Sequence, residues 1–228
     1  MAQTQSALAP SQRMRVAYLL AAVGGYLDAY TYLERGGVFA NAQTGNIIKL
    51  GIALSNGAQD SYLLFLLPIA SFVLGLFASL TIAEQLALRN RRLVRRSVLV
   101  VEMCGLAVVG LIPLGESWDA FANCVVSFVA AMQYETFTTF RGDAIVTTMS
   151  TGNLRKFVDC LYAGTLRHET KELARSARYL SIIFVFAMGA FFGSRACELL
   201  GRASIVPPIV VLGCVVVIIT VLHRRAVR

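Results

Sequence analysis

The sequence has few of the side chains that enzymes use for catalysis or metal binding. Of its 228 residues, 15% are charged and only two are histidine. The cysteines are odd in number, occur singly in apolar segments and form no C-x-x-C motif, so they indicate neither a disulfide framework nor a zinc site; they are Cys104, Cys124, Cys160, Cys197 and Cys214. A nucleophile elbow, an H-E-x-x-H motif, a phosphate-binding glycine loop and an Asp-rich metal signature are also absent. We therefore expect neither an enzyme nor a bound metal or cofactor.

Acidic residues are scarce as well, with 13 Asp and Glu against 21 Lys and Arg. The basic residues lie between apolar runs rather than on one amphipathic face, which is typical of topology signals and headgroup contacts and argues against nucleic-acid binding. Hydrophobic residues make up 57% of the chain, and its mean hydropathy is +0.65. A soluble domain of this size could not solvate such a surface, so we expect a polytopic protein whose main partner is the lipid bilayer.

Two segments of the chain repeat each other. Residues 28–49 align without a gap to residues 135–156, so that Asp28 matches Glu135 and Lys49 matches Lys156. The triplet Thr44-Gly45-Asn46 then falls on Thr151-Gly152-Asn153. A duplicated intramembrane charge beside an interrupted hydrophobic segment is typical of a transporter core that is built from two halves.

The hydrophobic pattern predicts one membrane domain over residues 14–223. It lies between a disordered tail (1–13) and a basic C-terminal tail (224–228). Six runs are apolar enough for spans: 15–34, 62–86, 97–114, 119–140, 178–200 and 205–222. Two further stretches, 36–56 and 142–164, are too polar for ordinary spans.

The distribution of basic residues decides whether the polar stretches cross the membrane. If neither crosses and the N-terminus is inside, fifteen basic residues face the cytoplasm and three face outward; if both cross, the count is nine against nine. We therefore predict two re-entrant stretches, cytoplasmic N- and C-termini and a location in the bacterial inner membrane. Three spans per half invert the second half (119–222) relative to the first (15–114), which gives a 3+3 inverted repeat.

Each polar stretch is expected to reach the midplane as extended backbone and to return as a half-helix. Val38-Phe39-Ala40 and Ile145-Val146-Thr147 favour extended backbone, and the threonines of the Thr-Gly-Asn triplets are candidate N-caps. Half-helix N-termini present free N–H groups and partial positive charge, which suit an anion or a carboxylate. The predicted solute site comprises Thr44, Gly45, Asn46, Lys49, Thr151, Gly152, Asn153 and Lys156.

The two aligned carboxylates, Asp28 and Glu135, are the predicted proton- or cation-coupling groups because charge inside a membrane is costly. They are placed to pair with the two lysines or to take up a proton. Plainer interpretations stay open: the triplets as polar turns, the lysines as snorkelling side chains and the carboxylates as structural hydrogen-bond acceptors. For three other acids near span ends, interfacial exposure is the favoured interpretation; they are Glu84, Glu102 and Glu198.

Three motifs give the chain a family resemblance. With Gly24-Gly25-Tyr26-Leu27-Asp28-Ala29, Gly36-Gly37-Val38-Phe39 and Thr44-Gly45-Asn46, it resembles the YoaK-like family of bacterial multi-span membrane proteins (domain of unknown function 1275). The resemblance covers about residues 14–223, and Gln43 stands where the family commonly has Met. It implies a multi-span inner-membrane protein. A strand followed by a half-helix also resembles the core of sulfate/bicarbonate and nucleobase carriers at the level of the fold.

The sequence thus predicts an all-α membrane protein of six transmembrane helices and two re-entrant half-helices. The favoured function is secondary transport of an anionic or zwitterionic small solute, coupled to protons. The alternatives are an ion channel with the same core and an enzymatic or non-transporting membrane protein. The sequence leaves homo-oligomerisation open.

Overall fold

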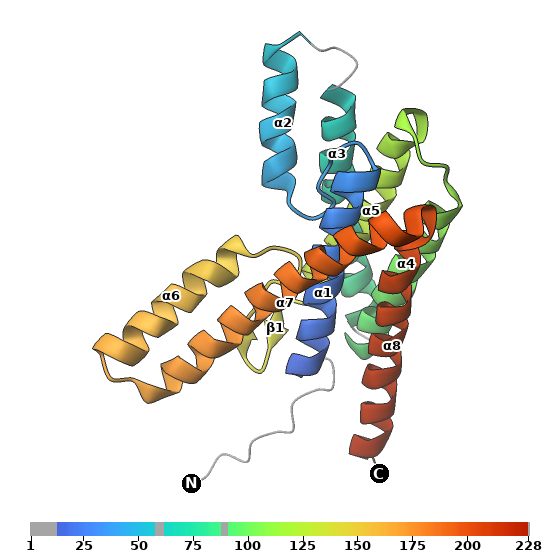
Figure 1. The fold of residues 1–228 in the computed structure, drawn as a ribbon. Helices are drawn as coiled ribbons and strands as arrows, with labels where there is room; N and C mark the ends of the chain where they lie inside the picture. The colour runs from blue at the N-terminus through green and yellow to red at the C-terminus, as the bar shows by residue number, and fades with distance from the viewer. Residues whose placement is uncertain (1–12, 58–61, 88–90, 228) are drawn as a thin grey trace.

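The computed structural model describes residues 13–57, 62–87 and 91–227, and most of them are helical (Figure 1). The elements in chain order are α1 (Met14–Glu34), α2 (Gln43–Ser55), α3 (Tyr62–Ala87), α4 (Arg91–Leu111), α5 (Glu116–Thr136), β1 (Thr139–Phe140), β2 (Asp143–Ala144), α6 (Thr151–Leu166), α7 (Thr170–Leu200), the 3₁₀ helix η2 (Gly201–Ile205) and α8 (Val206–Val227). The two strands form one antiparallel hairpin.

Each of the six apolar runs forms a helix, with shifts at the ends. Helix α7 starts at Thr170 rather than at 178, because its charged first turns are helical as well. Helix α8 continues through the predicted basic tail to Val227. The predicted disordered tail lies outside the described residues apart from Arg13.

By length and composition, two described segments, 62–85 and 170–222, could cross a membrane. The second of these contains both α7 and α8. The total of six spans remains a prediction.

Helices of the two halves pack across each other. Helix α1 lies along α7, and α5 lies along α3. Helix α4 contacts both α5 and α8, and α8 contacts α1. In chain order, α1, α3 and α4 of the first half correspond to α5, α7 and α8 of the second. When corresponding helices are exchanged, the α1–α7 contact becomes the α5–α3 contact and the α4–α5 contact becomes the α8–α1 contact. The α4–α8 contact stays the same.

Glycines permit the two cross-half contacts. A Cβ atom added to Gly189 of α7 would lie 2.1 Å from the Ala22 carbonyl oxygen of α1. A Cβ atom on Gly75 of α3 would lie 2.3 Å from the Phe128 carbonyl oxygen of α5. Both helix pairs therefore approach to backbone contact, the arrangement that small residues at four-residue spacing allow.

Two longer non-helical segments, residues 35–42 and 137–150, each precede a short helix; they are called the first and second break. After each break, a half-length helix leads away from the middle of the molecule: α2 toward the upper end in Figure 1 and α6 toward the lower left. Helix α2 then packs on α3, and α6 packs on α7. The two short helices thus start near one another in the centre and diverge.

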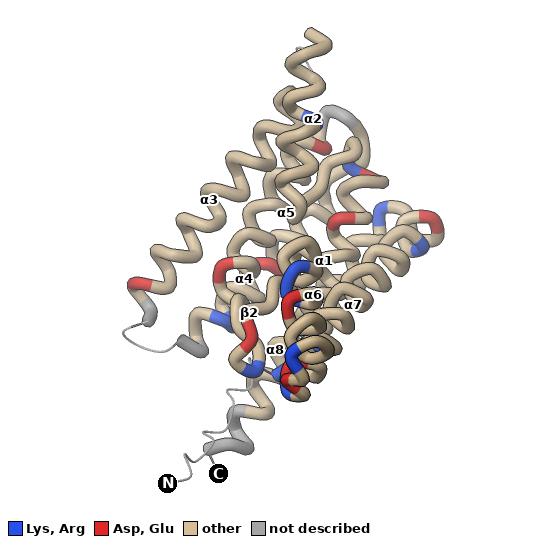
Figure 2. Tube along the Cα trace, turned by 90° about the vertical axis from the view of Figure 1, so that its left-hand side faces the viewer, with Lys and Arg blue, Asp and Glu red and all other residues tan. Residues whose placement is uncertain are grey.

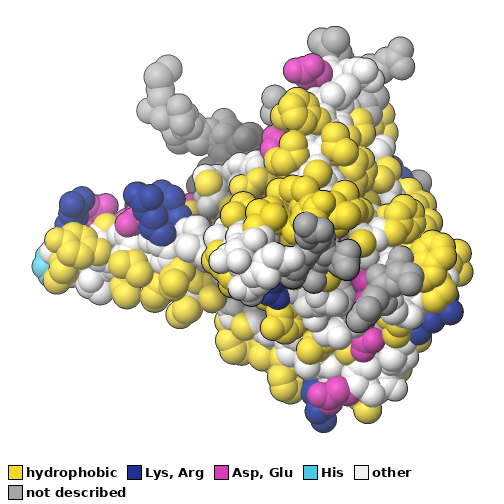
Figure 3. Space-filling model, turned by 90° about the horizontal axis from the view of Figure 1, so that it is seen from above, with side chains coloured by type: hydrophobic (Ala, Val, Ile, Leu, Met, Phe, Trp, Pro, Cys, Tyr) yellow, Lys and Arg dark blue, Asp and Glu magenta, His cyan; other side chains and the backbone are white. Residues whose placement is uncertain are grey.

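Large apolar side chains cover the outward faces of the long helices. Leu74 and Phe77 of α3, Phe184 and Phe191 of α7 and Val210 of α8 are all exposed. Figure 3 shows broad hydrophobic areas on the body and along one side of the α6–α7 hairpin, whose other side carries basic groups. In Figure 2, α3 is free of charge over nearly its whole length. This surface fits an all-α membrane protein.

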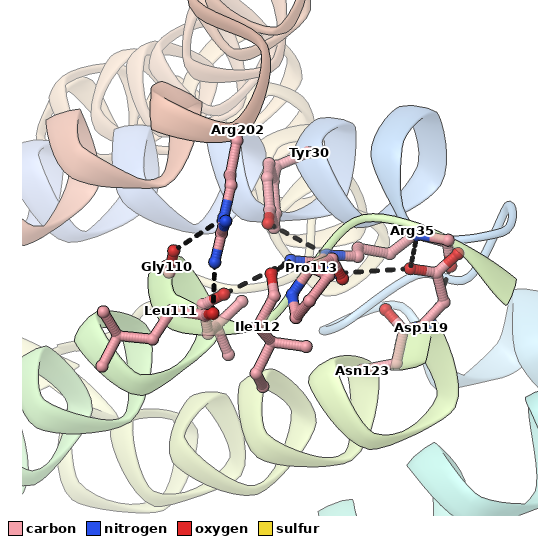
Figure 4. A network of polar contacts seen from close by, with 11 residues as sticks. Tyr30, Arg35, Gly110, Leu111, Ile112, Pro113, Asp119, Asn123 and Arg202 are labelled. Atoms are coloured by element: carbon pink, nitrogen blue, oxygen red, sulfur yellow. Dashed lines mark hydrogen bonds and ion pairs between the residues drawn. The ribbon is translucent and has the colours of Figure 1, made fainter. Parts of the chain in front are cut away.

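Two arginines from other elements satisfy the carbonyl groups at the end of α4 (Figure 4), which have no partner within the helix. Arg35 donates hydrogen bonds to the carbonyl oxygens of Pro113 (2.7 Å), Ile112 (3.1 Å) and Val109 (3.3 Å). Arg202 donates to the carbonyl oxygens of Gly110 (3.2 Å) and Leu111. The start of the first break and η2 are thereby fixed to the same helix end.

The side chain of Arg35 is fully buried, so its charge needs a partner. Its Nη1 lies 3.2 Å from Asp119 Oδ1, and its Nε donates to Tyr30 Oη at 3.1 Å. Asn123 Nδ2 donates to the Arg35 carbonyl oxygen at 2.7 Å. The buried ion pair links α1, α4 and α5 at one end of the molecule.

We expect Arg35→Gln to lower the free energy of unfolding by about 3–5 kcal/mol, because it leaves the Asp119 carboxylate buried without its cation. Chemical denaturation of the purified protein in detergent measures the change. Arg202→Gln is the matched control: its guanidinium also binds α4 carbonyls but is exposed, so its loss should cost about 1 kcal/mol or less. Equal effects of the two substitutions would contradict this account of the buried pair.

Candidate functional site

The asparagine of each Thr-Gly-Asn triplet holds the non-helical segment that precedes its helix. Asn46 Oδ1 accepts a hydrogen bond from the Phe39 N–H (3.0 Å), and Asn46 Nδ2 donates to the Phe39 carbonyl oxygen (2.6 Å). Asn153 makes the same pair of bonds with the N–H (3.1 Å) and carbonyl oxygen (2.5 Å) of Val146. Both asparagines are buried, and both reach back seven residues. Their amides therefore position the backbone rather than face a solute.

The threonines of the triplets are not N-caps, so that prediction is wrong. Helix α2 begins at Gln43 behind Ala42, and α6 begins at Thr151 behind Ser150, with no side-chain capping bond at either N-cap. The side chains of Asn46 and Asn153, here called the asparagine clamps, already hold the backbone ahead of each helix. Thr44 and Thr151 are left exposed.

The two glycines of the triplets have different surroundings. A Cβ atom on Gly45 would lie 2.8 Å from the Phe39 ring, so the missing side chain lets this ring cover the first turn of α2. A Cβ atom on Gly152 would meet nothing within 4 Å. The first turn of α6 is therefore the more open of the two.

Asp28 of α1 is buried and faces the first break. Its Oδ1 accepts hydrogen bonds from the Asn41 backbone N–H (2.8 Å) and from Asn41 Nδ2 (3.3 Å). Asn41 Nδ2 also donates to the Gly24 carbonyl oxygen, one turn earlier on α1 (3.0 Å). The carboxylate thus lies just ahead of α2, where a negative charge complements the helix N-terminus.

The second break reaches α1 at the same level. A Cβ atom on Gly24 would lie 2.7 Å from the Thr147 carbonyl oxygen and 3.2 Å from Thr148 Cα. Gly24 therefore lets residues 147–148 press against the α1 backbone, about one turn from Asp28. Both non-helical segments meet at this part of α1.

A cavity of about 470 Å³ lies where the two breaks meet. It is lined by Asp28, Ala29, Tyr32, Leu33, Phe39, Ala42, Thr44, Thr148, Met149, Ser150, Thr151, Phe186 and Ala190. The lining thus combines one carboxylate, several hydroxyl groups, aromatic rings and the first residues of both half-helices. It contains no lysine or arginine.

The two predicted site lysines lie outside this lining. Lys49 Nζ donates to the Gly37 carbonyl oxygen and lies 4.4 Å from the ring centre of Tyr32 and 5.0 Å from that of Phe39. The Tyr32 and Phe39 rings are stacked, with centroids 4.9 Å apart. Lys49 thus supports the aromatic wall of the cavity and is not paired with Asp28, and Lys156 is exposed on α6.

Glu135 does not repeat the surroundings of Asp28. It is half-buried and lines a separate cavity with Ser79, Glu84, Arg95 and Thr138. The internal repeat therefore preserves the backbone breaks but not the position of the carboxylate.

A further deeply buried acid is Glu102 of α4, in the first half of the chain, for which the sequence favoured interfacial exposure; that expectation is wrong. With the nitrogen of its amide turned toward Glu102, Gln133 of α5 donates to both carboxylate oxygens (3.1 and 3.2 Å). The other end of this amide lies 3.4 Å from Thr147 Oγ1 in the second break. Glu84 and Glu198 are exposed, as expected.

A charged cluster anchors the outer end of the second break. Asp143, which is buried, accepts hydrogen bonds from Arg175 Nε (2.8 Å) and Arg178 Nε (2.9 Å) of α7. Arg175 Nη1 also donates hydrogen bonds to both carboxylate oxygens of Glu172 at 2.9 Å. At the first break the charges are reversed: the break supplies the cation, Arg35, and the neighbouring helix α5 supplies the carboxylate, Asp119.

We expect Asn46→Ala and Asn153→Ala to destabilise the protein to a similar extent. Each removes both partners of a backbone N–H and carbonyl group, and a buried polar group without a partner costs about 1–3 kcal/mol. Chemical denaturation in detergent measures the loss. Asn56→Ala, at the exposed end of α2, is the matched control and should change stability by less than about 0.5 kcal/mol. Unchanged stability of either clamp variant would refute the positioning role of that asparagine.

Among the described residues, no group of three or more His, Cys, Asp or Glu side chains could hold a metal ion. No curated protein and no solved structure matched the chain. The model of one family, described as "Protein of unknown function (DUF1275)", matches residues 16–218. The match spans both breaks, both asparagine clamps and the central cavity. The chain therefore belongs to the DUF1275 family.

Proposed function

We propose that this protein is a secondary transporter of a small anionic or zwitterionic solute, and that the central cavity is its solute site. The observation that carries the proposal is the meeting of two broken segments at one cavity beside a buried carboxylate, Asp28. In a membrane, non-helical backbone is tolerated only inside protein or along a water-filled cavity. Transporters use such breaks to hold substrates near the midplane.

The membrane part of the proposal is six spans and two re-entrant half-helices, α2 and α6. Its support is the exposed apolar surface of the long helices and the positions of the two short ones. Helix α2 has 13 residues and α6 has 16, about 20–24 Å at 1.5 Å per residue, less than the thickness of a bilayer core. We place the protein in a bacterial inner membrane with both termini in the cytoplasm, in line with the distribution of basic residues.

The proposed architecture is a 3+3 inverted repeat. Its support comes from matched contacts of aligned residues. Asn46 and Asn153 clamp the aligned residues Phe39 and Val146. The Gly75-x-x-x-Ser79 motif of α3 corresponds to Gly189-x-x-x-Gly193 of α7. Ser79 meets Thr136 of α5, and Gly193 meets Ala29, the residue aligned with Thr136.

Asp28 is the proposed coupling group, with Glu135 as a second candidate at its own cavity. Asp28 lies beside the solute site and at the start of a half-helix, so its charge acts on both. An ion channel with the same core would conduct continuously and saturate poorly. An enzyme would need a second reactive group beside Asp28, and the other polar groups of the lining are hydroxyls and backbone.

Topology gives the first test. In a cysteine-free background, Asn56→Cys and Leu114→Cys should react with an impermeant thiol reagent from outside, and Gln85→Cys should react only after the membrane is opened. All three positions are exposed: Asn56 and Leu114 follow α2 and α4, and Gln85 lies in the last turn of α3. His168→Cys, on the cytoplasmic side in either topology, is the control. External labelling at Gln85→Cys would show that the polar stretches cross the membrane.

Transport gives the second test. Proteoliposomes should accumulate radiolabelled solute by saturable counterflow when a panel of amino acids and carboxylic acids is screened. Thr44→Trp should reduce uptake at least tenfold because the indole would fill the cavity, whereas Ile47→Trp, exposed on α2 outside the cavity lining, should not. Asp28→Asn should remove the pH dependence of uptake because an amide does not titrate. The fold should be kept, since Asn Oδ1 can still accept the Asn41 hydrogen bonds. Equal uptake by Thr44→Trp and the unmodified protein would rule out this cavity as the site.

A further inference from the structure

The two half-helices that start at the cavity differ in the carboxylate beside them. The start of α2 already has a carboxylate from the protein, because Asp28 accepts hydrogen bonds from the backbone and side chain of Asn41. The residue aligned with Asn41 in the second half is Thr148. Glu135, the residue aligned with Asp28, lies in the other cavity. The start of α6 is therefore built like that of α2 but has no aligned carboxylate beside it.

Thr148 gives an independent indication that a ligand group belongs at this place. Its side chain is 1% exposed and lines the cavity, and its Oγ1 has no hydrogen-bond partner among the described residues. A buried hydroxyl without a partner is unfavourable, and native proteins rarely leave one. A hydrogen-bond acceptor in the cavity would satisfy this hydroxyl group. It would also accept from backbone N–H groups in the open first turn of α6, at Thr151 and Gly152.

The rest of the lining selects against a ligand that is only an anion. Asp28 is the sole charged residue of the lining, and no lysine or arginine balances it. A carboxylate ligand would therefore bring a second negative charge into a cavity that is mostly apolar. A ligand with its own cationic group a few bonds away would balance Asp28.

We propose that the solute is a compact zwitterion of the α-amino-acid type. Its carboxylate accepts hydrogen bonds from Thr148 Oγ1 and from the first turn of α6, and its ammonium group lies against Asp28. This assignment rests on the proposed function, because it takes the cavity as the solute site. It makes Thr148 and Asp28 the residues that recognise the two opposite charges of one molecule.

The test uses the full-length protein in lipid nanodiscs and measures affinity by calorimetry at pH 7. The probes are the standard amino acids and, for each one that binds, the amine that lacks its carboxylate and the acid that lacks its ammonium group. We expect both truncated probes to bind at least tenfold more weakly than the amino acid, because each leaves one charge-assisted contact unmade.

Two substitutions assign the ends of the molecule. Thr148→Val keeps the shape and removes the hydroxyl, so it should weaken the amino acid and the acid about tenfold and leave the amine unchanged. Asp28→Asn should weaken the amino acid and the amine and leave the acid unchanged or tighter. Ser127→Ala is the matched control, because Ser127 also has a buried hydroxyl without a partner but does not line the cavity.

The outcomes separate this inference from the proposed function. If an amino acid binds and Thr148→Val has no more effect than Ser127→Ala, the assignment of the carboxylate to α6 is wrong. If acids without an ammonium group bind as tightly as amino acids, or if another class of solute is transported instead, the zwitterion is wrong and the transporter stands. If no solute of the panel binds or is taken up, both proposals fail.

Discussion

A helix that breaks inside an apolar molecule leaves backbone N–H and carbonyl groups that must find partners, and the whole centre of this protein is arranged around that requirement. Asn46 and Asn153 meet it for the residues that lead into α2 and α6. Arg35 donates hydrogen bonds to the carbonyl groups at the end of α4. Asp28 accepts a hydrogen bond from the Asn41 backbone N–H ahead of α2. Each break is thus held by side chains, and the space between the two breaks remains open as a cavity.

The two breaks share these backbone devices but differ in how a buried acid reaches them. At the first break, Asp28 of α1 accepts hydrogen bonds directly from Asn41. At the second break, Glu102 of α4 is linked to Thr147 only through the amide of Gln133. A pair of breaks that differ in this way can offer opposite chemistry to the two ends of one ligand, which a symmetric pair could not.

The sequence alone was sufficient to locate the breaks, because a polar Thr-Gly-Asn triplet that recurs in register inside apolar runs indicates an interrupted helix in each half. It also predicted the helical runs and the burial of Asp28. It could not assign the role within the triplet: the threonines looked like caps, yet the asparagines hold the backbone. Glu102 and Thr148 went unrecognised because their importance lies in neighbours on other elements. Nothing local to Glu102 distinguishes it from Glu84, which is exposed.

The close glycine contacts determine which parts of the molecule can move as one. Because the backbones of α1 and α7 touch at Gly189, and those of α3 and α5 touch at Gly75, each tightly joined pair takes one helix from each half of the sequence. Asp28 and Phe186 travel with the first pair, and Glu135 travels with the second. The rigid bodies of a conformational cycle would then be these mixed pairs rather than the sequence repeats.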